Sequence, residues 1–209
     1  MDALYRTPES PAVFVWVGRL ADRLVAAVAP DRGRFRALRV GFEVHSRAPA
    51  LRALRVALLV AGMARQRALP DEVARALVLA GLCLDLGHTL LPRGASAEVR
   101  RRHPHLSVDL LAGHGGLGPL ARAAIQGHHE RLDGSGSPLG LVGDAVPWPA
   151  RLLALCTAWV AATTPPPVGP ACPSYAASAS LAGPGFDARL RTELEALIAR
   201  RDDRWSLLP

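Results

Sequence analysis

Apolar residues recur every three to four positions through most of the chain, which is the spacing of one face of an α-helix. The first such stretch runs from Val13 to Val28 and ends before a proline, and the second runs from Leu51 to Ala64. Further helices are expected from Ser96 through RRRHPHLSVDLLAG, and over Asp71–Leu86, Leu117–His129, Pro149–Thr163 and Phe186–Arg201. The pattern predicts an all-α bundle of six or more helices around one core.

The stretch Asp71–Leu86 is almost entirely apolar, follows Pro70 and carries acidic residues in its first turn, so we expect it to be the central helix. The segment TTPPPVGPACPS contains too much proline for a helix and is expected to form an irregular loop before the last helix. We assign residues 1–48 to an N-terminal helical extension packed on the core, and residues 49–209 to the main domain.

Composition supports the helical class and adds a basic character. Half of the residues are hydrophobic and only 5% are aromatic, which favours packed helices over a β-sandwich. All 25 basic residues are arginines, against 18 acidic residues, and the formal net charge is +7. Because the arginines are scattered along the expected helices, the charge permits an anionic ligand but indicates no specific nucleic acid.

The cysteines and the N-terminus bear on the compartment. Cys83, Cys156 and Cys172 are far apart and form no CxxC motif, and two of them lie in apolar helical stretches, where a buried thiol is the usual interpretation. The N-terminal apolar run is short and has no basic region before it. We therefore expect a cytoplasmic protein without a signal peptide or a membrane span.

Polar residues with metal-binding chemistry gather around the segment GHHERLDGSGSP. His128 and His129 are adjacent there, His103 precedes a proline, and Asp85 and His88 end the central apolar stretch. An aspartate buried in such a stretch is costly unless it is paired or bound to a cation. Two interpretations stay open at this point: a metal site, or polar residues at helix ends with Asp85 paired to an arginine.

In the order of these segments, the sequence resembles the HD-GYP family, all-α metal-dependent phosphohydrolases whose characterised members hydrolyse cyclic di-GMP. HHERLDGSGSP resembles the family's HHE and DGxGYP signature, LDLGHTLLP stands where HDxGK belongs, and HPHLSVDLL stands where the HP segment belongs. The likeness covers roughly residues 50–200. It implies an HD-type helical bundle and a metal-dependent site for a cyclic dinucleotide.

Position by position, the resemblance implies one preserved metal site and one degraded site. Ligands of the preserved site are Asp85, His103, His128 and His129. At the other site the family's HD histidine, late aspartate and earlier histidine are replaced by Leu84, Thr157 and Arg52. We therefore expect either one divalent ion (Fe, Mn or Zn) or none. Arg52 is expected to fill the space of the missing ion and to approach Asp85.

Other replacements affect the substrate side of the site. The lysine of HDxGK becomes His88, which together with Arg52 is a candidate catalytic residue, and the tyrosine of GYP becomes Ser137. An arginine-bearing RPYR-like segment of the family is replaced by TTPPPVGPA. Candidates that remain for phosphate contact are Arg131, Arg151 and either Arg101 or Arg102.

Two functions compete on this evidence. The first is a degenerate, catalytically impaired HD-GYP domain that regulates cyclic di-GMP signalling by binding a diguanylate cyclase, a receiver domain or another signalling protein, or by sensing cyclic di-GMP. The second is an active cyclic di-GMP phosphodiesterase that uses one metal ion and Arg52. Metal content and hydrolysis of cyclic di-GMP distinguish the two.

Overall fold

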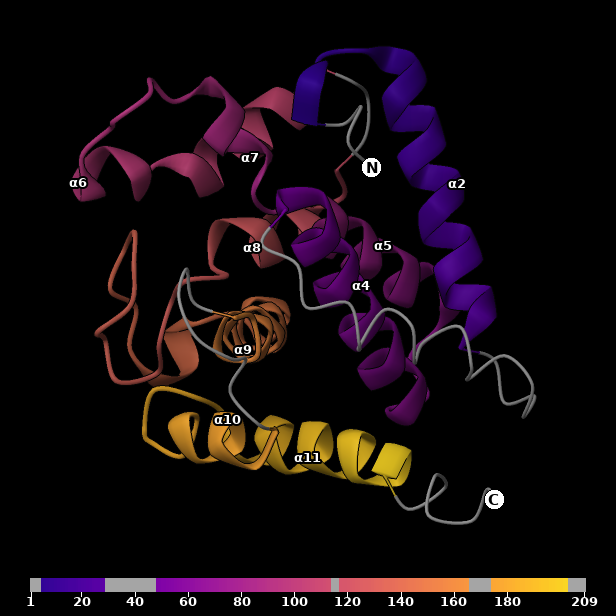
Figure 1. Cartoon of the computed structure of the whole chain (residues 1–209), viewed down its shortest axis with the longest axis vertical. Coiled ribbons are helices and arrows are strands. Elements are labelled where there is room, and N and C mark those ends of the chain that lie inside the picture. Colours follow the sequence, from indigo (N-terminus) through magenta and orange to yellow (C-terminus); the bar gives the residue numbers. More distant parts are fainter. Residues whose placement is uncertain (1–4, 29–47, 114–116, 166–173, 203–209) are drawn as a thin grey trace.

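The computed structural model describes residues 5–28, 48–113, 117–165 and 174–202, and these form a bundle of helices (Figure 1). Its elements are α2 (Pro11–Ala27), α4 (Pro49–Gln66), α5 (Asp71–Cys83), η1 (Leu86–Leu90), α6 (Ala97–Arg100), α7 (His103–Ala112), α8 (Pro119–Gln126), η2 (Gly143–Ala145), α9 (Trp148–Ala162), α10 (Ser174–Ser180) and α11 (Ala188–Asp202). Within the described part of the chain, the one β pairing is an isolated bridge between Asp133 and Val142. The all-α prediction is confirmed.

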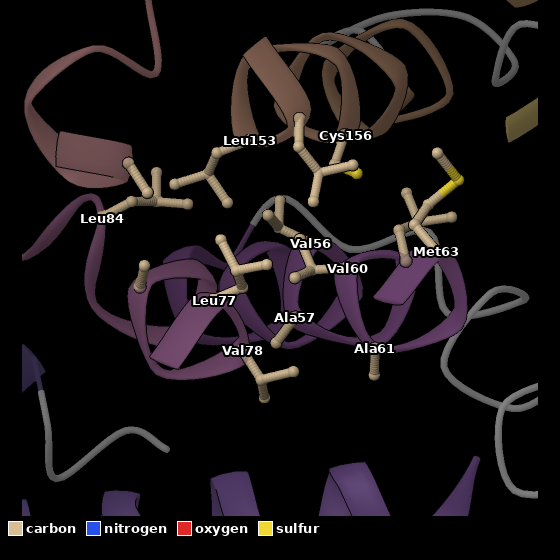
Figure 2. Close-up of a cluster of buried hydrophobic side chains, with 14 of the residues drawn as sticks. Val56, Ala57, Val60, Ala61, Met63, Leu77, Val78, Leu84, Leu153 and Cys156 are labelled. Carbon is tan, nitrogen blue, oxygen red and sulfur yellow. The ribbon is translucent and has the colours of Figure 1, made fainter. Parts of the chain in front are cut away.

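Helices α4 and α5 form the centre of the bundle. A Cβ atom on Gly81 of α5 would lie 3.1 Å from Cα of Ala57 on α4, so the two backbones approach closely at this glycine. Figure 2 shows Val56, Leu77 and Leu153 gathered between α4, α5 and α9. This apolar contact fixes the helices whose ends carry the polar residues of the site.

Helix α2 packs along α5 and makes contact with α4 (Figure 1). Its buried residues Val17 and Ala21 belong to the same core, and Asp22 forms an ion pair of 2.5 Å with Arg75 of α5. The predicted helix in this region is therefore present. The proposed domain boundary at residue 48 remains a prediction, because residues 29–47 lie outside the described part of the chain.

The central helix ends earlier than its apolar pattern predicts. Helix α5 stops at Cys83, where the sequence predicted a helix to Leu86, and the chain turns through Leu84 into η1. Leu84 stays in the core (Figure 2), whereas Asp85 turns away from it as the residue before η1. The apolar run continues through Leu86 because both sides of this turn are buried, so hydrophobicity alone does not show where the helix ends.

The helix expected from Ser96 to Gly113 is two helices, α6 and α7, separated by Arg101 and Arg102. Pro104 is the physical cause. A proline has no backbone N–H and its ring clashes with the carbonyl of the residue four positions before it, here Arg100. The break exposes that carbonyl, and His103 Nδ1 lies 2.8 Å from it.

The segment before the two adjacent histidines also ends early. Helix α8 stops at Gln126, and His128 and His129 lie in a turn rather than in the predicted helix that ends at His129. Helix α10 was not predicted. Most of the proline-rich loop before it, with Cys172, lies outside the described residues, while Cys83 and Cys156 are buried free thiols.

In the part of the chain that the structure describes, one stretch, Asp71–Leu90, is long and apolar enough to cross a membrane, with a mean hydropathy of 1.5 over its best window. Over half of that window, 56%, is buried inside the fold. This burial is typical of the core helix of a bundle, which passes the same test of length and composition.

Candidate metal centre

Asp85, His103, His128 and His129 come together at one end of the central helices, each contributing an atom within 4.8 Å of the others. His103 Nε2 lies 3.3 Å from Asp85 Oδ1 and 3.2 Å from His128 Nε2. The distance from His128 Nε2 to Asp85 Oδ1 is 3.8 Å. The expected convergence is present, but only His103 is helical, as the first residue of α7; the other three lie in turns beside helix ends.

Backbone carbonyls set the orientation of two histidine rings. Nδ1 of His103 lies 2.8 Å from the Arg100 carbonyl oxygen, and Nδ1 of His128 lies 2.6 Å from the Ile125 carbonyl oxygen. A carbonyl can only accept, so each Nδ1 donates and, in the neutral ring, Nε2 carries the lone pair. Metal-ligating histidines are held in the same way, by a hydrogen bond from the other ring nitrogen.

The resulting arrangement fits a cation. Two Nε2 lone pairs face each other across 3.2 Å, and one of them faces the Asp85 carboxylate at 3.3 Å. These contacts repel when both rings are neutral, unless a positive charge lies between them. A tetrahedral ion with bonds of about 2.1 Å holds its ligand atoms about 3.4 Å apart, which is close to the observed spacing.

Electrostatics favour the protonation states that bind metals. Burial lowers the pKa of His128 to about 4. Burial, together with the charges of His128 and His103, lowers the pKa of His129 to about 3. Burial by itself raises the pKa of Asp85, but the neighbouring His103, His128 and Arg52 lower it by more, so this pKa lies below its usual value. His128 and His129 are therefore neutral, and Asp85 is ionised, near pH 7.

Gly87 and Ser107 bring Asp85 to His103. A Cβ atom on residue 87 would lie 2.2 Å from the carbonyl oxygen of His103, so only glycine lets the turn lie against α7 at this point. The hydroxyl of Ser107 accepts from the N–H of Gly87 at 2.8 Å and donates to the carbonyl of Leu84 at 2.8 Å. This buried hydroxyl therefore fixes both sides of the turn that carries Asp85.

The glutamate of the HHE segment has a structural role in this protein. Glu130 is buried, and its two carboxylate oxygens accept from the N–H groups of Leu139 at 2.7 Å and Leu141 at 2.9 Å. Gly136 lies so close to this glutamate that a Cβ atom there would be 2.5 Å from Glu130 Cα. Glu130 thus folds the DGSGSP loop back beside the histidines, and it contributes no atom to the metal cluster.

The second set of positions has no comparable ligands. Leu84 packs in the hydrophobic core, and Thr157 is buried on α9 with its hydroxyl unpartnered among the described residues. Arg52 Nε and the Tyr5 hydroxyl are likewise buried without a partner there. The charge of Arg52 lowers the pKa of Asp85, so Arg52 lies near it, but no direct ion pair joins them. The expected close pairing is thus not seen.

A pocket of about 460 Å³ opens beside the cluster. His88, Arg101, Arg131 and Ser137 line it, so the structure brings these sequence candidates together. His88 stacks on His103 with ring centroids 3.9 Å apart, and its Nε2 lies 4.0 Å from Asp85 Oδ1. This places His88 at the rim of the cluster, and burial is the main cause that lowers its pKa.

Two other arginine candidates do not reach this pocket. Arg102 is exposed and is not among its lining residues. Arg151 donates to the carbonyl of Val146 at 2.7 Å and pairs with Asp144 at 3.0 Å and with Asp187 at 3.7 Å, so its guanidinium holds loops together. Sequence reasoning missed Arg100, which lines the pocket. The proline of the HP segment ends α6 at Arg100, and this helix break could have been predicted from the sequence.

Comparison with protein families identifies an HD domain over residues 41–184. The cyclic di-GMP phosphodiesterase response regulator RpfG of Xanthomonas campestris is 36% identical over 108 residues, covering 46% of this chain and 29% of that protein. The cyclic di-GMP phosphodiesterase PA4108 of Pseudomonas aeruginosa is 32% identical over 122 residues, covering 54% of this chain and 30% of that protein. This chain therefore matches about a third of the length of these relatives.

The fold has a counterpart among solved structures. Bd1817, described as a HDG"Y"P protein from Bdellovibrio bacteriovorus, matches with a TM-score of 0.77 at 17% identity, covering 95% of this chain and 67% of that one. At this identity the likeness shows the fold alone. Because the HD domain match spans most of the chain and includes the turn of Asp85, the HP segment and both histidines of HHE, the chain belongs to the HD domain family, as a member of the HD-GYP type.

Proposed function

We propose that this chain is a regulatory HD-GYP domain in cyclic di-GMP signalling, which holds one divalent transition metal ion and hydrolyses cyclic di-GMP poorly or not at all. Asp85, His103, His128 and His129 would bind the ion, with Fe, Mn or Zn as the candidates. Its regulatory output would pass to a protein partner such as a diguanylate cyclase or a receiver domain. We choose cyclic di-GMP as the ligand because two relatives are named as cyclic di-GMP phosphodiesterases.

The orientation of His103 and His128 supports the single ion most directly. Both rings donate from Nδ1 to backbone carbonyls, so both Nε2 atoms are left to face Asp85 Oδ1. A bound ion at this point supplies a Lewis acid for a phosphate oxygen. Around it, burial keeps the His128 imidazole neutral by lowering its pKa, and the turn at Gly87 holds the carboxylate of Asp85.

Loss of the second ion supports the impaired activity. Two-metal hydrolases stabilise the attacking and the leaving oxygens with two ions about 4 Å apart. At the second site the shared Asp85 remains, but Leu84, Thr157 and Arg52 stand where the resemblance implies the other three ligands. An alkyl side chain such as that of buried Leu84 cannot bind an ion at all.

One observation favours the alternative, an active phosphodiesterase with a single ion. Arg52 is close enough for its charge to lower the pKa of Asp85, and the Nε of this arginine is buried without a partner among the described residues. A fixed guanidinium there could stabilise negative charge on a phosphate in place of the second ion. His88, at the pocket rim, would then be the candidate that moves a proton.

The test combines metal content with turnover. We expect the protein as purified, or after incubation with Mn, to hold one ion per chain by elemental analysis, and His128→Ala to hold none. His105→Ala is the matched control, because His105 lies on the same helix as His103 but outside the cluster. We expect hydrolysis of cyclic di-GMP and of an aryl phosphodiester with added Mn to stay far below about 1 per second.

Each result decides between the two functions. Turnover on the order of 1 per second or more, abolished by His128→Ala, would establish the active phosphodiesterase. One bound ion without turnover supports the regulatory domain. No bound ion under any condition would remove the metal from the proposal and leave a binding domain alone.

A further inference from the structure

The pocket beside the histidine cluster has a positively charged wall. Arg100 and Arg101 line it from the end of α6, and Arg131 lines it from the loop that follows α8. In Figure 1 this loop extends toward α6, and residues of both segments line the pocket. His88 and His129 lie on the lining between them. At about 460 Å³ the pocket has the size of a small-molecule site.

These arginines differ in their partners from the arginines that hold elements of the fold together. Arg67, Arg75 and Arg151 each form an ion pair with a carboxylate. Among the described residues, none of the three pocket arginines has a carboxylate partner at ion-pair distance. The charge of Arg100 also reaches His88, where it contributes to the lowered pKa. The carboxylates of Asp133 and Glu130 lie close enough to Arg131 to interact with its charge, but no ion pair joins them to it. With Arg100 and Arg101, the wall therefore keeps a net positive charge, and this attracts anions.

Two of the guanidinium groups are held in place. Arg131 stacks over the ring of Phe186, with 4.4 Å from Cζ to the ring centroid, and donates to the carbonyl of Glu130 at 2.9 Å. Arg100 donates from NH1 to the carbonyl of Ala95. Each keeps further N–H donors for a ligand, because a guanidinium has five. Fixed donors lose little conformational entropy on binding, which raises affinity.

We propose that Arg100, Arg101 and Arg131 form a phosphate-binding site that holds a dinucleotide with two phosphate groups whether or not the metal ion is bound. This deepens the proposed regulatory function, since it names the residues that would sense the ligand. In a two-metal hydrolase the ions themselves hold the phosphate, so metal and substrate are bound together. Here three permanent charges on two segments do so, and a ligand with two phosphates contacts both segments.

The experiment measures binding of cyclic di-GMP by calorimetry, once in EDTA and once with saturating Mn. We expect the two dissociation constants to agree within about fivefold, and we expect GMP, with one phosphate, to bind about tenfold more weakly. Arg101→Gln and Arg131→Gln should each weaken cyclic di-GMP binding about tenfold in both conditions, as the loss of one charge-assisted contact predicts. The linear dinucleotide pGpG, with two phosphates, shows whether the ring is required.

Arg102→Gln is the matched control, because Arg102 is adjacent and exposed but does not line the pocket, and we expect it to change affinity less than about twofold. Arg131→Gln also loses the stack on Phe186, so the exposed Arg101→Gln provides the variant whose fold is secure, and melting curves verify both. Binding that disappears in EDTA, or that neither pocket variant weakens, overturns the inference. A chain that binds no Mn but keeps arginine-dependent binding overturns the metal proposal and leaves this one intact.

Discussion

Asp85 has histidines on one side and an arginine on the other, and the two neighbours have different consequences. On one side His103 and His128 approach its Oδ1 to within 3.3 and 3.8 Å. On the other, Arg52 contributes charge without an ion pair. The sequence predicted that a long arginine in place of a histidine would enter the vacated space, and its buried Nε agrees with that position. It could not predict the distance, which depends on the packing of α4 against the turn.

Replacing Arg52 tests how much this charge matters. Because Arg52 forms no direct ion pair with Asp85, Arg52→Ala should lower the free energy of unfolding of the metal-free protein by only about 1 kcal/mol, at the low end of the cost of removing a buried charged partner. Chemical denaturation in EDTA measures this. Arg65→Ala, an exposed arginine near the end of the same helix, should change the stability by less than about 0.5 kcal/mol. Equal changes in the free energy of unfolding for the two variants would show that the charge of Arg52 near Asp85 does not stabilise the fold.

At the scale of the elements, periodicity predicted the existence of most helices but not the ends that form the site. Helices α4 and α9 agree with their predicted ranges to within two residues. The predicted ends at Leu86 and His129 were wrong, because α5 stops at Cys83 and α8 at Gln126. An apolar pattern reports burial, and the turns beside α5 and α8 are as buried as the helices, so burial alone cannot mark where a helix ends.

Close contact between α7 and the turn before η1 gives a prediction at this scale. Gly87→Ala would place a Cβ atom 2.2 Å from the carbonyl oxygen of His103 and 2.7 Å from the backbone nitrogen of Ser107. Since backbone atoms cannot move away as a flexible side chain does, α7 must shift and carry His103 away from Asp85. We expect a loss of about 3 kcal/mol in stability and at least a tenfold loss in Mn affinity.

The control for this change is Gly118→Ala, at a glycine with open space around its Cβ position. It should leave Mn affinity within about twofold, because it does not alter any contact of the cluster. Denaturation curves and Mn titrations of both variants provide the measurement. If Gly87→Ala binds Mn as the unchanged protein does, the contact between α7 and the turn does not position the site.

At the scale of the whole molecule, the candidate ligands are far apart in sequence and meet only through the core. Asp85 and His129 are joined through α4, α5 and α9, whose apolar residues pack together (Figure 2). The family resemblance predicted this meeting, because it carried information on the fold that composition and spacing do not contain. The closed ring of Glu130, Leu139 and Leu141 was not predicted, since two backbone N–H groups in a glycine-rich loop leave no sequence pattern.

Because the three ligand segments are separate parts of one cooperative fold, an ion that joins them should stabilise the whole molecule rather than one loop. Binding only to the native state adds about 2.7 kcal/mol when the free ion is at 100 times its dissociation constant. For a chain of 209 residues this corresponds to a rise of about 5 to 10 °C in the melting temperature. We expect Mn or Zn to produce this rise, EDTA to reverse it, and Mg, which prefers oxygen ligands, to have little effect. The same ions should leave His128→Ala unchanged, since its cluster retains only one carboxylate and two histidines. An equal rise in that variant would mean that the ion binds elsewhere on the protein and that the histidine cluster has no part in holding it.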